Sequence, residues 1–294
     1  MKNICKLTFA VLAFTMIFTA TELNAQSNED SKIGLTVGLD YVSNYLYRGQ
    51  YYFYGNLRNG GMFSPYAFYN IFNTGLFIGV KGEITERWFY DNNDEAKEDD
   101  LFDWFNSIDF NIDYRYSFKK IITFNIGGWY YLYKTIHYSS ESFNPSSLDI
   151  YLSATIDALQ LRPMIAVTYS YYMNENYYRY QDKGKNGDIY VQLGIGHSFK
   201  IFDSTYLDLD AIAGFLDKNA SDRRMMERPD RIGSTDISDI DFSTGLTTTA
   251  GVLTLSASFH YIITPGTQYK FEESNNINKE IHKFYTKFGV ACSI

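Results

Sequence analysis

Strict alternation between apolar and polar side chains is the feature that most constrains this chain. From Ser107 to Phe118, every second residue is isoleucine, tyrosine or phenylalanine, and the residues between them are serine, aspartate, asparagine or arginine. Side chains of a β-strand point alternately to the two sides of a sheet, so this segment has one apolar and one polar face. A helix would spread the same residues around its whole circumference. The pattern therefore predicts a long β-strand.

Alternating segments of this kind recur along the chain and number about twelve. They lie around residues 33–41, 62–72, 76–84, 107–118, 124–132, 148–156, 165–171, 189–195, 207–213, 240–246, 253–261 and 284–294. The 27 tyrosines and 23 phenylalanines also favour strands. Beyond the N-terminal region, the sequence contains no apolar run near the ~20 residues that a membrane-spanning helix needs. We predict an all-β fold.

The connections between these segments are alternately short and long. The short ones lie near 73–75, 119–120, 159–162, 202–204 and 250–251, and the long ones near 44–61, 86–106, 134–147, 174–187, 217–236 and 264–279. Bacterial outer-membrane barrels have an even number of strands, short periplasmic turns and long extracellular loops. The sequence therefore predicts a transmembrane antiparallel up-and-down β-barrel of about 12 strands in the outer membrane, with apolar faces toward lipid.

The N-terminal residues are typical of a secretory signal peptide. Lys2 and Lys6 precede an apolar stretch at residues 7–18, and Leu23-Asn24-Ala25 offers a cleavage site. A retained anchor helix is the alternative. We assign residues 1–25 to the signal peptide, 26–31 to a short N-terminal periplasmic segment and 32–294 to the barrel.

Aromatic side chains gather where the predicted strands meet the long connections. These residues are Tyr45, Tyr47, Trp88, Phe89, Tyr90, Trp129, Tyr131, Tyr133, Tyr171 and Tyr172. Because aromatic girdles occur at membrane interfaces, we expect these rings to form one. The chain also ends within its last alternating strand, which is typical of substrates of the barrel-assembly machinery. A secreted soluble β-sandwich with carboxylates on its exterior is the alternative fold.

The polar faces of the predicted strands are rich in acid, in keeping with the formal net charge of -8. The candidate lumen-lining residues are Asp40, Glu83, Asp109, Asp113, Arg115, Asp149, Asp157, Asp188, Asp208, Asp210, Asp239 and Asp241. Glycines on the same faces, such as Gly38 and Gly79, favour a narrow aqueous path. Rings of acidic side chains favour cations, so we predict weak cation selectivity. The alternative is that these groups pair, as Asp113 and Arg115 could, or merely hydrate the wall.

The segment after the first predicted strand reads Ser43-Asn44-Tyr45-Leu46-Tyr47-Arg48-Gly49. It resembles the opening of the TorF family of outer-membrane proteins, whose pattern is matched here by Ser43, Tyr45, Arg48 and Gly49. The strand Gly75–Val80 resembles that family's second-hairpin strand, but it lacks the tryptophan expected nearby. The clear resemblance covers about the first sixty residues after the signal peptide. It implies an outer-membrane barrel with a proposed role in passive transport.

Several classes of function are disfavoured by the sequence. The negative net charge argues against nucleic acid, which needs a basic face. The sequence contains no zinc, P-loop or dinucleotide motif, and we expect neither metal nor cofactor. Ser256, Ser258 and His260 share one strand face, with Asp239 and Asp241 on a neighbouring strand. A catalytic triad requires hydrogen-bond reach and not merely a shared face, so we expect no enzymatic activity.

Two long connections carry opposite charge, acidic within residues 91–100 and basic within 223–231. The simpler interpretation is that both connections are solvated loops, and the more specific one is that they contact lipopolysaccharide. Our leading hypothesis is a porin-like outer-membrane channel for passive diffusion of small polar or cationic solutes. A non-transporting surface, adhesin or envelope-structural barrel is the alternative, and an outer-membrane hydrolase is the third.

Overall fold

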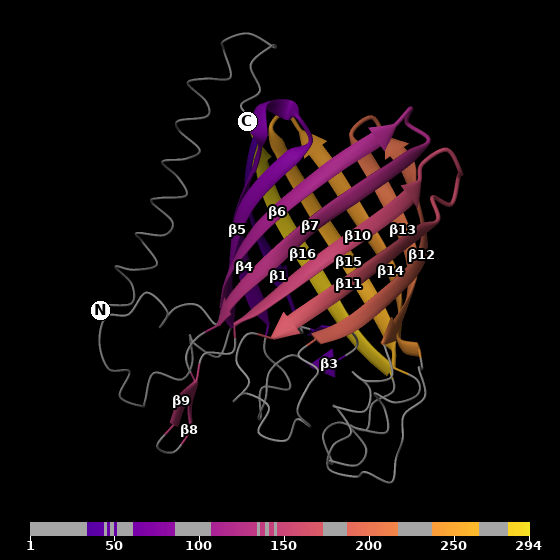
Figure 1. The fold of residues 1–294 in the computed structure, drawn as a ribbon. Helices are drawn as coiled ribbons and strands as arrows, with labels where there is room; N and C mark the ends of the chain where they lie inside the picture. Colours follow the sequence, from indigo (N-terminus) through magenta and orange to yellow (C-terminus); the bar gives the residue numbers. More distant parts are fainter. Residues whose placement is uncertain are drawn as a thin grey trace.

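The computed structural model describes residues 34–43, 46–47, 50–51, 61–85, 107–133, 136–138, 141–143, 146–172, 187–216, 237–264 and 282–294. Within them, twelve strands form one closed antiparallel barrel (Figure 1). The barrel strands are β1 (Leu35–Val42), β4 (Met62–Asn70), β5 (Leu76–Thr85), β6 (Ser107–Phe118), β7 (Ile122–Tyr133), β10 (Ser147–Ile156), β11 (Met164–Tyr172), β12 (Gly187–Phe202), β13 (Thr205–Leu216), β14 (Ile237–Ala250), β15 (Leu253–Ile263) and β16 (His282–Ser293). The predicted signal peptide and the 26–31 segment lie outside the described residues.

Three smaller elements lie in the connections. A short hairpin, β2 (Leu46–Tyr47) and β3 (Gln50–Tyr51), follows β1. A second hairpin, β8 (Ile136–Tyr138) and β9 (Glu141–Phe143), follows β7. A 3-10 turn, η1 (Ile71–Asn73), joins β4 to β5. No helix among the described residues is long and apolar enough to cross a membrane.

The first strand closes the barrel by pairing with β4 on one side and β16 on the other. Asp40 lies opposite Ser64 in β4 and opposite Gly289 in β16. The closure continues past the strand, because Thr286 donates its amide hydrogen to the Ser43 hydroxyl at 2.9 Å. A closed sheet has no free edge, which satisfies backbone hydrogen bonding where lipid offers no partner.

The short connections lie together at one end of the barrel, which we call the turn end (Figure 1). Gly34 and Ile294 also meet there, with a hydrogen bond of 2.8 Å from the Gly34 amide to the Ile294 carbonyl. The turn at Lys119 and Lys120 has φ values of 52° and 58°. Two positive φ values are typical of the tight hairpin turns that match strand twist. The alternation of short and long connections predicted from sequence is confirmed, and we call the opposite end the loop end.

The outer surface of the barrel is apolar and exposed. Ile112, Leu152 and Phe284 expose 56%, 54% and 52% of their surfaces, and many other large apolar side chains do the same. So continuous an apolar exterior is suited to hydrocarbon and unsuited to water. The predicted orientation, with apolar faces toward lipid, is confirmed, and the soluble sandwich is excluded.

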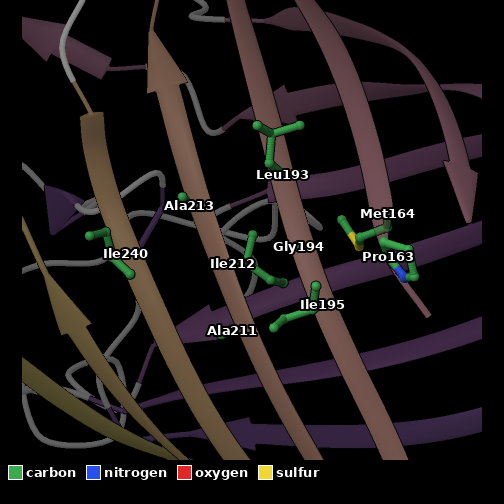
Figure 2. A pocket seen from close by; sticks show the side chains of 9 residues that line it. All are labelled: Pro163, Met164, Leu193, Gly194, Ile195, Ala211, Ile212, Ala213 and Ile240. Atoms are coloured by element: carbon green, nitrogen blue, oxygen red, sulfur yellow. The ribbon is translucent and has the colours of Figure 1, made fainter. Parts of the chain in front are cut away.

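A shallow hollow interrupts this outer surface over β12, β13 and β14 (Figure 2). The small side chains of Ala211 and Ala213 lie there among Leu193, Ile195 and Ile240. The lining is apolar, so it offers no group that would orient a polar solute.

Inward side chains are buried at the loop end and become accessible toward the turn end. On β6, Ser107 and Asp109 are 0% exposed and Asn111 is 8% exposed, whereas Arg115 is an exposed residue. The same gradient occurs on β10, from buried Asp149 to half-buried Ser153. The interior is therefore tightly packed near the loop end and open to water nearer the turn end.

Candidate functional site

The candidate site is the inner surface of the barrel, where the structure places the residues predicted to line it. In the barrel strands these residues alternate with the exposed apolar side chains and so point inward. Asp157 lies in the turn after β10, where its carboxylate binds Thr123 at 2.6 Å and Arg162 at 3.0 Å. The backbone of Asp188 occupies an inward position opposite Ser170, and its side chain lies outside the description.

One part of the inner surface, on β12 to β15, is lined by carboxylates and hydroxyls, and we call it the acid–hydroxyl wall. Ser198 and Thr247 donate hydrogen bonds to the Asp208 carboxylate at 2.5 and 3.0 Å. Ser243 donates to Asp210 at 3.4 Å. The register of β12, β13 and β14 produces these contacts, because it places Ser198 opposite Asp208 and Ser243 opposite Asp210.

Two more carboxylates on this wall are bound as well. The Tyr190 hydroxyl donates to Asp239 at 3.0 Å, and the Ser238 hydroxyl donates to the same carboxylate. His260 Nδ1 lies 3.1 Å from Asp241 Oδ2. Bound carboxylates of this kind hold neighbouring strands together and fix their own orientation.

A Ser–His–Asp chain runs through this wall. Ser258 Oγ lies 3.0 Å from His260 Nε2, and His260 Nδ1 faces Asp241. The Tyr285 ring stacks on the imidazole with centroids 4.2 Å apart. The structure thus brings Ser258 and Asp241 within hydrogen-bond distance of His260, which the sequence alone did not establish. Asp239 instead accepts a hydrogen bond from Tyr190. Serine hydrolases have the same order of groups.

The opposite part of the inner surface, on β4 to β7 and β10, combines carboxylates with aromatic rings, and we call it the acid–aromatic wall. Asp109 is 0% exposed, and neither of its carboxylate oxygens has a hydrogen-bond partner. The Lys81 ammonium lies 3.9 Å from Asp109 but only 2.7 Å from Glu83. Lys81 therefore pairs primarily with Glu83.

Unsatisfied oxygens are concentrated on this wall. Among the described residues, the buried side-chain oxygens without a hydrogen bond belong to Ser107, Asp109 and Asp113. All three residues lie on the inward face of β6. Buried polar groups are almost always satisfied in folded proteins, and exceptions often indicate a water or an ion.

Aromatic rings extend along the same wall in a connected run. Centroids are 5.5 Å apart for Tyr66 and Phe68, 5.9 Å for Phe68 and Trp129, 6.3 Å for Trp129 and Tyr131, and 6.0 Å for Tyr131 and Tyr133. The prediction that Trp129, Tyr131 and Tyr133 belong to a membrane girdle is wrong. The register places Tyr131 opposite Asp109 and Trp129 opposite Asp149, both inward residues.

The reason for this error is that both faces of β7 are apolar or aromatic near the loop end. Ile126, Tyr130 and Leu132 alternate with Gly127, Trp129 and Tyr131, so polarity does not identify the inward face. The neighbouring strands provide the missing information, since their carboxylates share a face with these rings. Tyr171, by contrast, does face outward and is 38% exposed.

Two inward glycines also differ from the expectation that they widen the path. A side chain at Gly38 would collide with the Tyr66 ring, and one at Gly79 would collide with the Phe68 ring. These glycines therefore make room for neighbouring rings, which occupy the space that the missing side chains leave.

Inward basic groups are distributed unevenly. Lys287 binds Asp40 at 2.8 Å. Arg115 donates a hydrogen bond to Asn125 at 3.1 Å and its guanidinium lies 5.3 Å from the Phe77 ring centroid. These contacts, rather than the suggested pairing with Asp113, orient the Arg115 side chain.

The residues that resemble the TorF motif are only partly described. Ser43 joins β1 to β16 through the hydrogen bond to Thr286. Tyr45, Arg48 and Gly49 lie outside the described residues. Among the residues that are described, no group of three or more His, Cys, Asp or Glu side chains is arranged to hold a metal ion.

No protein-family model and no curated protein sequence matches the chain. Among solved structures, the NanC porin matches with a TM-score of 0.51 at 10% identity over 88% of this chain and 100% of that chain. The KdgM porin gives a TM-score of 0.45 at 9% identity, covering 88% of this chain and 99% of that one. An outer membrane channel from Pseudomonas putida F1 gives 0.44 at 10% identity, covering 91% and 99%. The match to the NanC porin shows a shared fold, and barrels of this class reside in the outer membrane.

Proposed function

We propose that this chain is a porin-like channel for passive diffusion of small polar solutes with a preference for cations. One observation carries the proposal: a closed barrel with an apolar exterior has an acidic interior that is open to water toward the turn end. The inward side chains of Asp40 and Asp241 are 22% and 21% exposed, so the inner surface is not a packed core. Side chains fill the interior of barrels of about eight strands, and a barrel of twelve strands is wider.

Charge favours cations in such a path. Inward carboxylates outnumber the inward lysine and arginine residues on the described strands. A low-dielectric wall strengthens the field of these groups over what bulk water allows. The porin names of two similar structures and the resemblance of residues 43–49 to the TorF family support the same role.

Planar-bilayer recording of refolded protein tests the proposal. We expect discrete conductance steps and a reversal potential of cationic sign in a KCl gradient. Replacing Asp109, Asp113, Asp208 and Asp210 together with asparagine should reduce that potential. Asp203→Asn, at a fully exposed carboxylate in a short turn, is the control and should leave the potential unchanged. Unchanged selectivity in the quadruple variant would remove the acidic path as its cause.

A non-transporting surface or adhesin barrel makes a different prediction. Its activity would reside in the long connections, most of which lie outside the described residues. Absence of current from correctly folded protein would favour that role. Folding is checked independently by the change in gel mobility on heating in detergent.

We further propose that the protein contacts outer-membrane lipid and lipopolysaccharide and that the barrel-assembly machinery inserts it. The apolar exterior supports lipid contact, and closure of the barrel by the pairing of β1 with β16 supports machine-dependent assembly. Depletion of the machinery should lower the amount of heat-shifted barrel in membranes.

The Ser258–His260–Asp241 chain favours hydrolysis as a second candidate function, but its surroundings oppose it. Ser258 pairs with Gly245 in β14 and Lys287 in β16, so its backbone lies within ladders on both sides. An oxyanion hole requires donors aimed at the reacting oxygen, which strand amides engaged in a ladder do not supply. We propose that these three hydrogen-bonded residues stiffen the wall and that the protein is not an enzyme.

Covalent labelling distinguishes these roles. A fluorophosphonate probe should leave the folded protein unlabelled. Labelling that disappears in Ser258→Ala and His260→Ala but persists in Ser256→Ala would instead establish a serine hydrolase. Ser256 is a suitable control because it lies on the same strand face and outside the hydrogen-bonded chain.

A further inference from the structure

At the loop end of the acid–aromatic wall, carboxylates are buried while the aromatic rings beside them reach the accessible surface. Asp109 and Asp149 are 0% and 5% exposed. Trp129 and Tyr131 lie between them on β7 and are only half-buried. Residues directly opposite in an antiparallel sheet have Cβ atoms about 5 Å apart. Each ring therefore lies beside a buried carboxylate.

The negative charge of Asp109 is only partly compensated. Its oxygens make no hydrogen bonds although the side chain is fully buried. A weakly compensated buried carboxylate is costly, and the ion pair of Asp109 with Lys81 is long, at 3.9 Å. Glu83 and Asp109 share the single positive charge of Lys81, which lies on β5. One further cation would balance the charge more closely.

The rings define what kind of cation fits. A metal ion prefers several oxygen ligands, whereas much of the accessible lining here is aromatic. Trp129 and Tyr131 stack with an interplanar angle of 22° and present an extended π surface. Ammonium groups are attracted to the faces of such rings, and Trp is the strongest partner. A carboxylate beside aromatic faces is the arrangement that recognises alkylated amines.

We infer that Asp109, Asp149, Trp129 and Tyr131 form a binding site for an organic ammonium cation, through which such a solute passes the narrow loop end of the barrel. This inference rests on the proposed channel function and names its solute class. The ammonium group and its alkyl substituents lie against the two rings, and the negative charge of Asp109 attracts them from below the accessible surface. Lys81 remains paired with Glu83.

Isothermal titration calorimetry in a non-ionic detergent tests the site without requiring conductance. Choline chloride is the probe, with total ionic strength held constant by KCl. The uncharged analogue 3,3-dimethyl-1-butanol controls for shape. We expect saturable choline binding and no saturable binding of the alcohol. Asp109→Asn should weaken choline binding about tenfold, and Trp129→Leu should weaken it several-fold.

Two further variants make the outcome decisive. Asp203→Asn changes the same functional group in an exposed turn and should bind choline as the native protein does. Asp149→Asn provides a second test if Asp109→Asn does not fold, as judged by heat-dependent gel mobility. Equal binding of choline by the native protein and by folded Asp109→Asn would overturn the site.

One further result tests the class of cation, and two others separate the site from the channel. Choline binding that K⁺ abolishes at equal concentration would indicate an inorganic cation site and overturn the organic class. A protein that binds choline but passes no current would refute the channel and keep the site. A protein that conducts cations but binds no choline would refute the site alone.

Discussion

The carboxylates on opposite walls of the barrel differ in their hydrogen bonding. On β14, Asp239 and Asp241 each contact a hydrogen-bonding side chain. On β6, six strands away in the barrel order, Asp109 is buried with both oxygens unsatisfied. Both strands show the same alternating sequence pattern. The difference comes from the neighbours, which are hydroxyls and a histidine on one side and aromatic rings on the other.

The contrast indicates a division of labour. A satisfied carboxylate has its lone pairs committed to other strands and contributes to stability. An unsatisfied one costs stability, and its negative charge attracts a cationic solute. Functional sites in folded proteins commonly depart from local satisfaction in this way. We therefore assign structure mainly to the acid–hydroxyl wall and recognition mainly to the acid–aromatic wall.

The largest expected effect is on stability at Asp208. Asp208→Ala removes the acceptor of two hydrogen bonds, from Ser198 and Thr247. The free energy of unfolding should fall by about 1–3 kcal/mol, measured by urea denaturation in detergent. Asp109→Asn, the counterpart on the other wall, should leave that free energy unchanged or raise it by about 1 kcal/mol. If Asp109→Asn lowered the free energy of unfolding as much as Asp208→Ala, the distinction between the two walls would be contradicted.

A smaller effect is expected from the aromatic side of the contrast. Trp129→Leu preserves an apolar inward residue but removes the π face next to Asp149. The affinity for choline should fall by an amount equivalent to about 0.5–2 kcal/mol, measured by calorimetry. Tyr285→Leu, which removes the ring stacked on His260, should leave choline binding intact. If both changes weaken binding equally, aromatic residues on the two walls are equivalent.

The smallest effect is expected at Ser258. Ser258→Ala removes one hydrogen bond to His260 and leaves the His260–Asp241 contact in place. Unfolding free energy should fall by about 0.5–1.5 kcal/mol, because the net contribution of one such bond is modest. A change in ion selectivity without a change in stability would show that Ser258, His260 and Asp241 line the solute path.

Much of the fold could be predicted from the sequence because a single rule governs it. Apolar residues at every second position, as in β6 and β15, specify both the strand and its lipid-facing side. Short connections such as Lys119-Lys120 then dictate antiparallel neighbours. The small hairpins β2–β3 and β8–β9 were not predicted, since segments of two or three residues carry no measurable periodicity.

The site was harder to predict, for two physical reasons. Periodicity gives the face of a residue but not its contacts, so Asp109 and Asp208 could not be told apart until the cross-strand register was known. Where both faces are apolar, as in β7, even the face is undetermined, and Trp129 was misassigned. The Ser258–His260–Asp241 chain illustrates the first limit again, because its members were known to share a face but not to touch.

Ion selectivity of paired variants tests the division between the walls most directly. The reversal potential in a KCl gradient is measured for Asp109→Asn/Asp149→Asn and for Asp208→Asn/Asp210→Asn, each in planar bilayers. Asp109 and Asp149 are buried at the narrow end, where their field is poorly screened, whereas Asp208 and Asp210 are more accessible to water. We predict that the first pair removes the larger part of the cation preference. An equal loss in both pairs, or a larger one in the second, would contradict the account.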